Sequence, residues 1–175
     1  MNTIFSLFNL TFLIFTVLLF LRAAYHKVSD FTEFQGFVAD YELVPEWLVK
    51  PVAVFLAAAE AGLVVLMLIP ATRTVGLIAA ALLLVGYGVA IMVNLHRGRR
   101  QVECGCGGAP QLLSGSLIAR NLVLALMALS PALAGVPEHF NSQELVAAIV
   151  AALTLSAFYA LFEQANANHQ AIRTR

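Results

Sequence analysis

Two cysteines separated by one glycine, Cys104 and Cys106, are the residues of this sequence best suited to chemistry. They lie in Glu-Cys-Gly-Cys-Gly-Gly, residues 103–108, which we call the cysteine loop. Two thiols at this spacing can form a disulfide, bind a soft metal ion or exchange electrons with another dithiol. A disulfide between residues two apart closes a small, strained ring, and strained disulfides are easily reduced. The spacing therefore favours thiol–disulfide exchange over a structural crosslink.

Charged residues surround the cysteines. Arg97, Arg99 and Arg100 precede them, and the N-terminus of a predicted helix follows them. Both features favour the reactive thiolate, whereas Glu103 opposes it. The alternative role of these arginines is to hold the loop at the lipid headgroups.

Metal binding is the competing use of the two thiols. A closed zinc site needs four ligands, and the nearest histidine, His96, lies eight residues before Cys104. Copper with two ligands would need only the two thiolates. We predict no metal site, and we keep metal handling and chemically inert cysteines as alternatives.

The elements that must position the loop are membrane helices. Of the 175 residues, 61% are hydrophobic and only 11% are charged, whereas about a quarter are charged in soluble proteins. Five apolar runs have the length of roughly 20 residues that a membrane span needs. They are residues 4–25, 51–69, 74–95, 116–134 and 143–163. We predict a single all-α integral membrane domain, residues 1–175, with about five transmembrane helices forming a four-helix-type bundle plus one additional helix. A re-entrant fourth segment is the alternative.

An amphipathic segment is predicted between the first two spans. Aromatic and apolar residues recur at helical spacing over residues 31–41, with polar residues between them. This segment lies at the membrane interface or packs against the ends of the bundle. Trp47 suits an interfacial position, and Pro51 suits the first turn of the second span.

Glu60 stands near the middle of the second predicted span. A carboxylate at that depth requires a partner, a proton or water. It is either an interhelical hydrogen-bonding group or a functional group, which would be a proton acceptor or a hydrogen-bond donor to a bound quinone, and Tyr87 is its candidate partner. Arg22, His26 and Lys27 close the first span, and Arg120 opens the fourth on the same side. These residues either face Glu60 or a ligand across the bundle or snorkel toward water, which is the commoner behaviour. Arg120 is thus a further candidate site residue.

The basic residues predict the orientation. One side of the membrane would carry nine of them and the other side only Arg73. The nine are Arg22, Lys27, Lys50, Arg97, Arg99, Arg100, Arg120, Arg173 and Arg175. By the positive-inside rule the N-terminus is outside and the C-terminus and the cysteine loop are cytoplasmic. The same residues form no basic patch, which excludes a nucleic-acid partner and leaves membrane lipid as the surroundings.

Several motifs together resemble the MauE family of methylamine utilisation membrane proteins. They are residues 21–30, Leu-Arg-Ala-Ala-Tyr-His-Lys-Val-Ser-Asp; residues 41–45, Tyr-Glu-Leu-Val-Pro; Glu60; residues 94–100, Asn-Leu-His-Arg-Gly-Arg-Arg; the cysteine loop; and residues 119–122, Ala-Arg-Asn-Leu. The cysteine loop with its basic lead-in is the specific part. The end of the first helix is shared more widely with DoxX-like membrane proteins.

The resemblance implies a bacterial inner-membrane protein that helps to mature the methylamine dehydrogenase small subunit, a disulfide-rich periplasmic protein, beside a thioredoxin-like protein of the MauD type. On this hypothesis Cys104 and Cys106 cycle between dithiol and disulfide by exchange with that partner. A membrane quinone is the candidate electron carrier, and no other cofactor is predicted. Two alternatives stay open, a non-catalytic assembly or export factor and a metal-handling membrane protein, so enzymatic activity as a thiol–disulfide oxidoreductase is left undecided.

Overall fold

The computed structural model describes residues 3–105, 111–136 and 140–173, and most of these residues are helical. The helices there are α1 (Thr3–Ser29), α2 (Phe31–Asp40), α3 (Glu46–Leu68), α4 (Arg73–His96), α5 (Gly115–Ala134) and α6 (Ser142–Arg173). All except α2 are long and apolar enough to cross a membrane, which makes five candidate spans. The predicted all-α class and the number of spans are confirmed, and α5 is one continuous helix.

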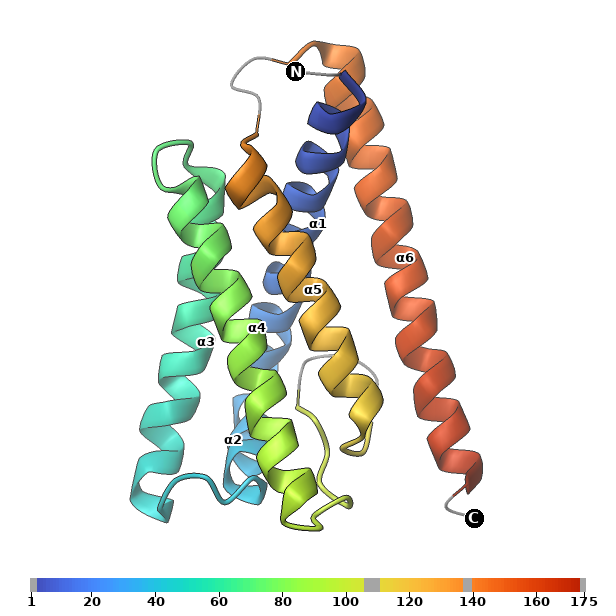
Figure 1. The fold of residues 1–175 in the computed structure, drawn as a ribbon. Coiled ribbons are helices and arrows are strands. Elements are labelled where there is room, and N and C mark those ends of the chain that lie inside the picture. The colour runs from blue at the N-terminus through green and yellow to red at the C-terminus, as the bar shows by residue number, and fades with distance from the viewer. Residues whose placement is uncertain (1–2, 106–110, 137–139, 174–175) are drawn as a thin grey trace.

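Four of the long helices form a bundle and the fifth lies outside it. α1 contacts α3 and α5, and α4 contacts the same two helices, so these four close a ring. α6 packs along α1 and leans away from the rest of the bundle (Figure 1). The sequence prediction of a four-helix-type bundle plus one helix is therefore confirmed.

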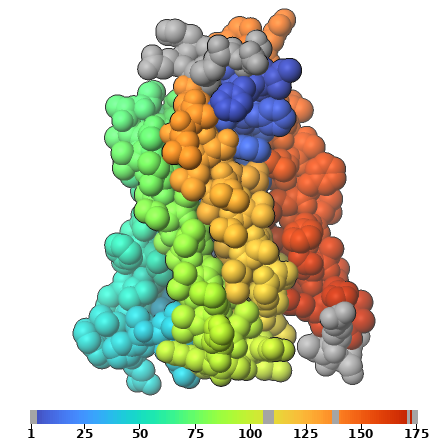
Figure 2. Space-filling view, viewed as in Figure 1, coloured from blue at the N-terminus to red at the C-terminus, as the bar shows by residue number. Residues whose placement is uncertain are grey.

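Apolar side chains point both into the bundle and out of it. Met67, Leu77 and Ala128 are fully buried inside it, whereas Phe55 and Leu82 are exposed on its outer surface. Figure 2 shows this outer surface over α4 and α5, which lie side by side. An apolar exterior on an apolar core is expected where lipid surrounds the helices.

Three helices have ends that differ from the predicted spans. α1 continues to Ser29, because Lys27 in its last turn is buried against Glu60 and does not interrupt the helix. α3 begins at Glu46, so Pro51 lies inside the helix and the prediction that it occupies the first turn is wrong. α6 continues to Arg173, well beyond the apolar run that defined its predicted end.

α2 is the predicted amphipathic segment. The Asp30 carboxylate caps its N-terminus by accepting a hydrogen bond from the Glu33 backbone N–H at 3.1 Å. Phe34 is buried, and the helix contacts α1 and α3 at the end of the bundle that carries the cysteine loop. Of the two expected arrangements, the structure shows the helix packed against the bundle end.

Candidate functional site

A short antiparallel bridge holds the stem of the cysteine loop. The Cys104 N–H donates to the Gln111 carbonyl at 2.9 Å, and the Leu113 N–H donates to the Val102 carbonyl at 3.0 Å. Cys104 is disulfide-bonded. The predicted second residue of the redox pair, Cys106, lies outside the described residues. The bridge was not predicted, since the intervening sequence shows no strand pattern.

The C-terminal part of α6 clamps the same stem. The side chain of Gln170 accepts a hydrogen bond from the Leu112 N–H at 2.8 Å and donates to the Leu112 carbonyl at 3.3 Å. Gln111 donates through Nε2 to the Glu163 carbonyl at 3.2 Å. The polar turns of α6 that extend beyond its predicted end thus position the cysteine loop.

α2 lies against the other side of the loop. Gly105 has a φ of +64°, and a Cβ at this position would lie 2.9 Å from both Cβ and Cδ2 of Phe37. Glycine is required by the backbone conformation and by this close approach. The Tyr41 hydroxyl donates to the Cys104 carbonyl at 3.2 Å. Burial raises the pKa of Tyr41 to about 12, although the nearby Arg120 charge acts to lower it.

Arg120 connects the cysteine to a buried carboxylate. Its Nη2 donates to the Cys104 sulfur at 3.6 Å, and its Nη1 lies 3.1 Å from Glu163 Oε1. Arg22 Nη1 lies 3.1 Å from the other oxygen of Glu163. Arg120 and Glu163 are buried, with 7% and 3% of their side chains exposed, whereas Arg22 reaches the surface. We call Arg22, Arg120 and Glu163 the arginine cluster; it holds two cations and one anion.

Glu60 forms a second buried group with Lys27 and Tyr87. The Lys27 ammonium lies 2.9 Å from each carboxylate oxygen of Glu60, and the Tyr87 hydroxyl donates to Oε1 at 2.7 Å. The two charged side chains are 2% and 1% exposed. Tyr87 is thus confirmed as a partner of Glu60, and Lys27 faces Glu60 and does not snorkel. The proposed proton or quinone role of Glu60 stays a prediction.

A small cavity of about 30 Å³ separates the two groups. Glu60 and Tyr87 line one part of it, and Arg120 and Tyr159 line another. Arg120 Nε is buried and has no hydrogen-bond partner among the described residues. The volume suits a single water molecule, so the two buried groups are separated by a space that one water can fill.

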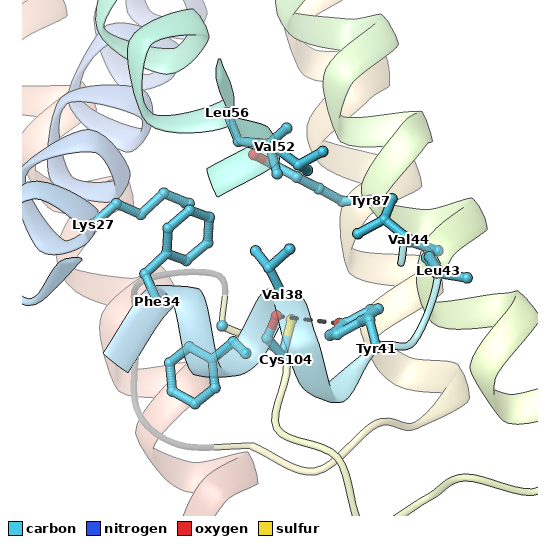
Figure 3. A pocket seen from close by; sticks show the side chains of 13 residues that line it. Lys27, Phe34, Val38, Tyr41, Leu43, Val44, Val52, Leu56, Tyr87 and Cys104 are labelled. Carbon is cyan, nitrogen blue, oxygen red and sulfur yellow. Dashed lines mark hydrogen bonds between the residues drawn. The ribbon is translucent and has the colours of Figure 1, made fainter. Parts of the chain in front are cut away.

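A larger cavity of about 120 Å³ lies beside Cys104 (Figure 3). Apolar side chains from α2, α3 and the α2–α3 turn form most of its wall. The polar side chains that reach it are Lys27, Tyr41 and Tyr87. Glu60 is not among its lining residues, so Glu60 contacts this space only through Lys27 and Tyr87.

Glu163 is the site residue that sequence reasoning missed. It stands at the end of the last apolar run, where a charged residue is expected to meet water. Helical spacing could have identified it. Glu163 lies on the same face of α6 as Ala148, Ala152 and Tyr159. Ala148 and Ala152 are fully buried, and Glu163 continues their row.

The arginines before the cysteines have other partners than the sulfur. Arg97 donates to the Glu42 carbonyl at 3.1 Å, and Arg99 lies 2.7 Å from the Glu42 carboxylate. Both therefore tie the end of α4 to the α2–α3 turn. Among the described residues, no three His, Cys, Asp or Glu side chains gather as metal ligands.

The fold and site define a polytopic helical membrane protein that holds a cysteine loop at one end of its bundle and two buried ion pairs inside the bundle. Comparison with known families then gives a specific assignment. The family described as "Methylamine utilisation protein MauE" matches residues 4–135, and the chain belongs to this family.

Named relatives agree with this assignment. The Methylamine utilization protein MauE of Methylorubrum extorquens is 40% identical over 116 residues, which cover 65% of this chain and 62% of the relative. The protein of the same name from Paracoccus denitrificans is 37% identical over 119 residues, 67% of this chain and 64% of the relative. The protein of the same name from Methylophilus methylotrophus is 34% identical over 150 residues, which cover 83% of this chain and 79% of the relative. The match spans less than two thirds of the first two relatives, and no solved structure matches the chain.

Proposed function

We propose that this chain is a membrane thiol–disulfide exchange protein that supports biogenesis of the methylamine dehydrogenase small subunit, through its disulfide formation, processing or export. The observation that carries the proposal is the contact of Arg120 with the Cys104 sulfur. The arginine cluster holds one more cation than anion, and a thiolate on Cys104 would balance it. A neighbouring cation favours the thiolate, which is the form that attacks and leaves in disulfide exchange.

The exchange needs two steps and conserves electrons. One thiolate of the partner's dithiol attacks a sulfur of the Cys104–Cys106 disulfide and forms a mixed disulfide, and the other cysteine of this chain leaves as a thiolate. The second thiolate of the partner then displaces this chain, which keeps both electrons as a dithiol. Arg120 stabilises the thiolate at Cys104, and the same contacts serve the reverse reaction. We assign the partner role to a thioredoxin-like protein of the MauD type.

Membership of the MauE family supports this biological setting, since the relatives are named for methylamine utilisation. The fixed geometry of the loop supports the exchange chemistry. Gln170 and Tyr41 hold the stem from two sides, which would present the sulfur of Cys104 in one orientation to a partner.

For the orientation we propose a bacterial inner-membrane protein with its N-terminus outside and its C-terminus in the cytoplasm. Lys27 and Arg120 are buried in ion pairs, so their positions follow from these pairs and carry no information on which side of the membrane they face. Lys50, Arg97 and Arg100 are exposed at the loop end, whereas Arg73 begins α4 at the opposite end. The loop would then face the cytoplasm, and serving a periplasmic client would require electrons to be relayed across the membrane.

A non-catalytic assembly or export factor is the second candidate. The observation in its favour is the clamp on the loop, because a disulfide held between α2 and α6 also suits a structural docking surface. Metal analysis of the purified protein, with its thiols protected, tests the metal-handling alternative separately.

Thiol trapping tests the exchange hypothesis directly. Intact and permeabilised cells are treated with a membrane-impermeant thiol reagent, before and after reduction, during growth on methylamine. We expect a mixture of reduced and oxidised protein and a mixed disulfide with a partner. We also expect labelling only after permeabilisation, which would support the cytoplasmic placement.

The matched variant is Cys104→Ser/Cys106→Ser, compared with Ser114→Ala, which changes a hydroxyl just beyond the loop. Loss of the mature small subunit in the double variant alone is the expected result. Normal maturation in the double variant would refute the exchange hypothesis and leave the assembly factor.

A further inference from the structure

We infer that the 120 Å³ cavity beside Cys104 binds the ring of a membrane quinone, and this inference deepens the proposed function by locating its electron carrier. The cavity lies between α2, α3 and α4 at the loop end of the bundle (Figure 3). Cys104 and Gly105 form part of its wall, so a ring bound there lies next to the sulfur that undergoes exchange.

The size and lining of the cavity fit one six-membered ring. An apolar cavity of about 150 Å³ in another protein stays dry and binds benzene, and this cavity has a comparable 120 Å³. Val38, Val52 and Leu56 supply apolar wall, and Phe34 offers an aromatic face. The cavity is also partly open, so substituents and an isoprenoid tail can extend from the ring toward lipid.

Lys27 and Tyr87 place two polar groups on the wall of the cavity. Lys27 Nζ lies 5.1 Å from the centre of the Phe34 ring and 5.7 Å from that of Tyr87. An ammonium has three donor hydrogens, and the two contacts with Glu60 oxygens leave one that can reach a ring carbonyl. Glu60 is therefore the group that positions Lys27 and Tyr87, and Lys27 is the group that would touch the quinone.

Of the two kinds of membrane molecule that could enter this cavity, a lipid acyl chain and a quinone, the lining favours a quinone. A lipid acyl chain would fill the apolar wall but would leave the third N–H of Lys27, the one that does not face Glu60, without an acceptor, which is costly in a dry space. A quinone offers an apolar ring with two carbonyl acceptors, and it also accepts electrons. The ring thus matches the apolar wall, and the carbonyl groups match the donor of Lys27.

The electron balance is complete with this ligand. The dithiol of the cysteine loop loses two electrons and two protons as its S–S bond forms. The quinone gains two electrons and two protons and leaves as a quinol. The loop is then oxidised and ready to accept electrons from the partner dithiol of the proposed exchange.

Binding of ubiquinone-1 to the purified full-length protein in lipid nanodiscs tests the inference by equilibrium dialysis. Leu56→Phe fills the cavity, Leu56→Met keeps its volume, and Leu82→Phe adds the same ring to the lipid-facing surface of α4, where Leu82 is 68% exposed. We expect saturable binding that Leu56→Phe weakens at least tenfold, while the other two variants bind as the parent does. Lys27→Met, measured with Glu60→Leu so that no buried charge remains unpaired, should also weaken binding.

Absence of saturable binding to the parent, or equal binding by Leu56→Phe and Leu82→Phe, would overturn the quinone site. Cys104→Ser/Cys106→Ser should still bind ubiquinone-1, because the cavity and not the thiols holds the ring. Binding with no thiol exchange in cells would sink the proposed function and leave the site standing. Exchange in cells without binding would sink the site alone.

Discussion

The guanidinium of Arg120 donates to the sulfur of Cys104 at 3.6 Å across the gap between α5 and the loop. The same guanidinium is held through its other terminal nitrogen by Glu163 on α6. A buried cation held at a cysteine sulfur would favour the thiolate after reduction. This contact makes the reactivity of Cys104 depend on a residue 16 positions further along the chain.

Replacing Arg120 should slow the reaction of Cys104 with thiol reagents. In a Cys106→Ser background, Arg120→Gln removes the cation and should lower the alkylation rate near neutral pH by about tenfold, the change that one pKa unit brings. The rate as a function of pH, measured with iodoacetamide, checks this. Arg97→Gln is the control, since Arg97 is exposed and bonds to Glu42; equal slowing by both variants would contradict a specific role for Arg120.

Breaking the buried pair of Lys27 and Glu60 should destabilise the bundle. Lys27→Met leaves the Glu60 carboxylate buried without its cation, which typically costs about 3–5 kcal/mol. Lys27→Met with Glu60→Leu removes both charges and should recover most of that loss. Denaturation in mixed micelles measures the free energy of unfolding. Additive effects of the two changes would show that the pair contributes no coupling.

The sequence predicted the membrane architecture because apolar runs near 20 residues must be helical in lipid. All five predicted spans are helices. Their ends were harder to predict, because hydropathy marks where lipid stops and not where the helix stops. α6 shows this best: its last turns are polar, and they continue because Gln170 bonds to the loop stem.

The site was only partly predictable for the same reason. Glu60 was identified because a carboxylate within a long apolar run demands an explanation. Glu163 stands at the end of a run, where charge is ordinary, so nothing in its immediate neighbourhood distinguishes it. Its role depends on the tertiary approach of Arg120 and Arg22 from α5 and α1.

Adding a methyl group at Gly105 should displace the loop from α2. Gly105→Ala would place its Cβ against Phe37 and hold a non-glycine residue at φ +64°, which costs about 1–2 kcal/mol before the collision is counted. Thermal unfolding should show the loss, and Phe37→Ala should relieve the collision but not the backbone strain. Gly36→Ala is the control: Gly36 has open space in α2, so this change should stabilise the helix by about 0.5–1 kcal/mol. An unaffected Gly105→Ala protein would contradict the close packing.

Tyr41 should make stability depend on alkaline pH. Its pKa is raised to about 12 in the folded protein from 10.0, chiefly by burial. The unfolded state therefore ionises first, and the contribution of Tyr41 to stability is fully present below pH 10 and is lost as the pH rises toward 12. Tyr41→Phe should show a smaller loss of stability than the parent over this window. Identical pH profiles of the two proteins would show that Tyr41 does not titrate as its burial requires.

Gln170 should control the order of the loop stem without affecting the bundle. Gln170→Ala removes the hydrogen bonds to both the N–H and the carbonyl of Leu112. Amide hydrogen exchange at Leu112 should then become at least tenfold faster, while exchange in α4 and α5 stays unchanged, because the clamp lies outside the bundle core. Gln164→Ala is the matched control, since Gln164 bonds only to Asn168 on its own helix among the described residues. If both variants leave exchange at Leu112 unchanged, Gln170 does not hold the loop stem, and the reach of α6 beyond its apolar run needs another cause.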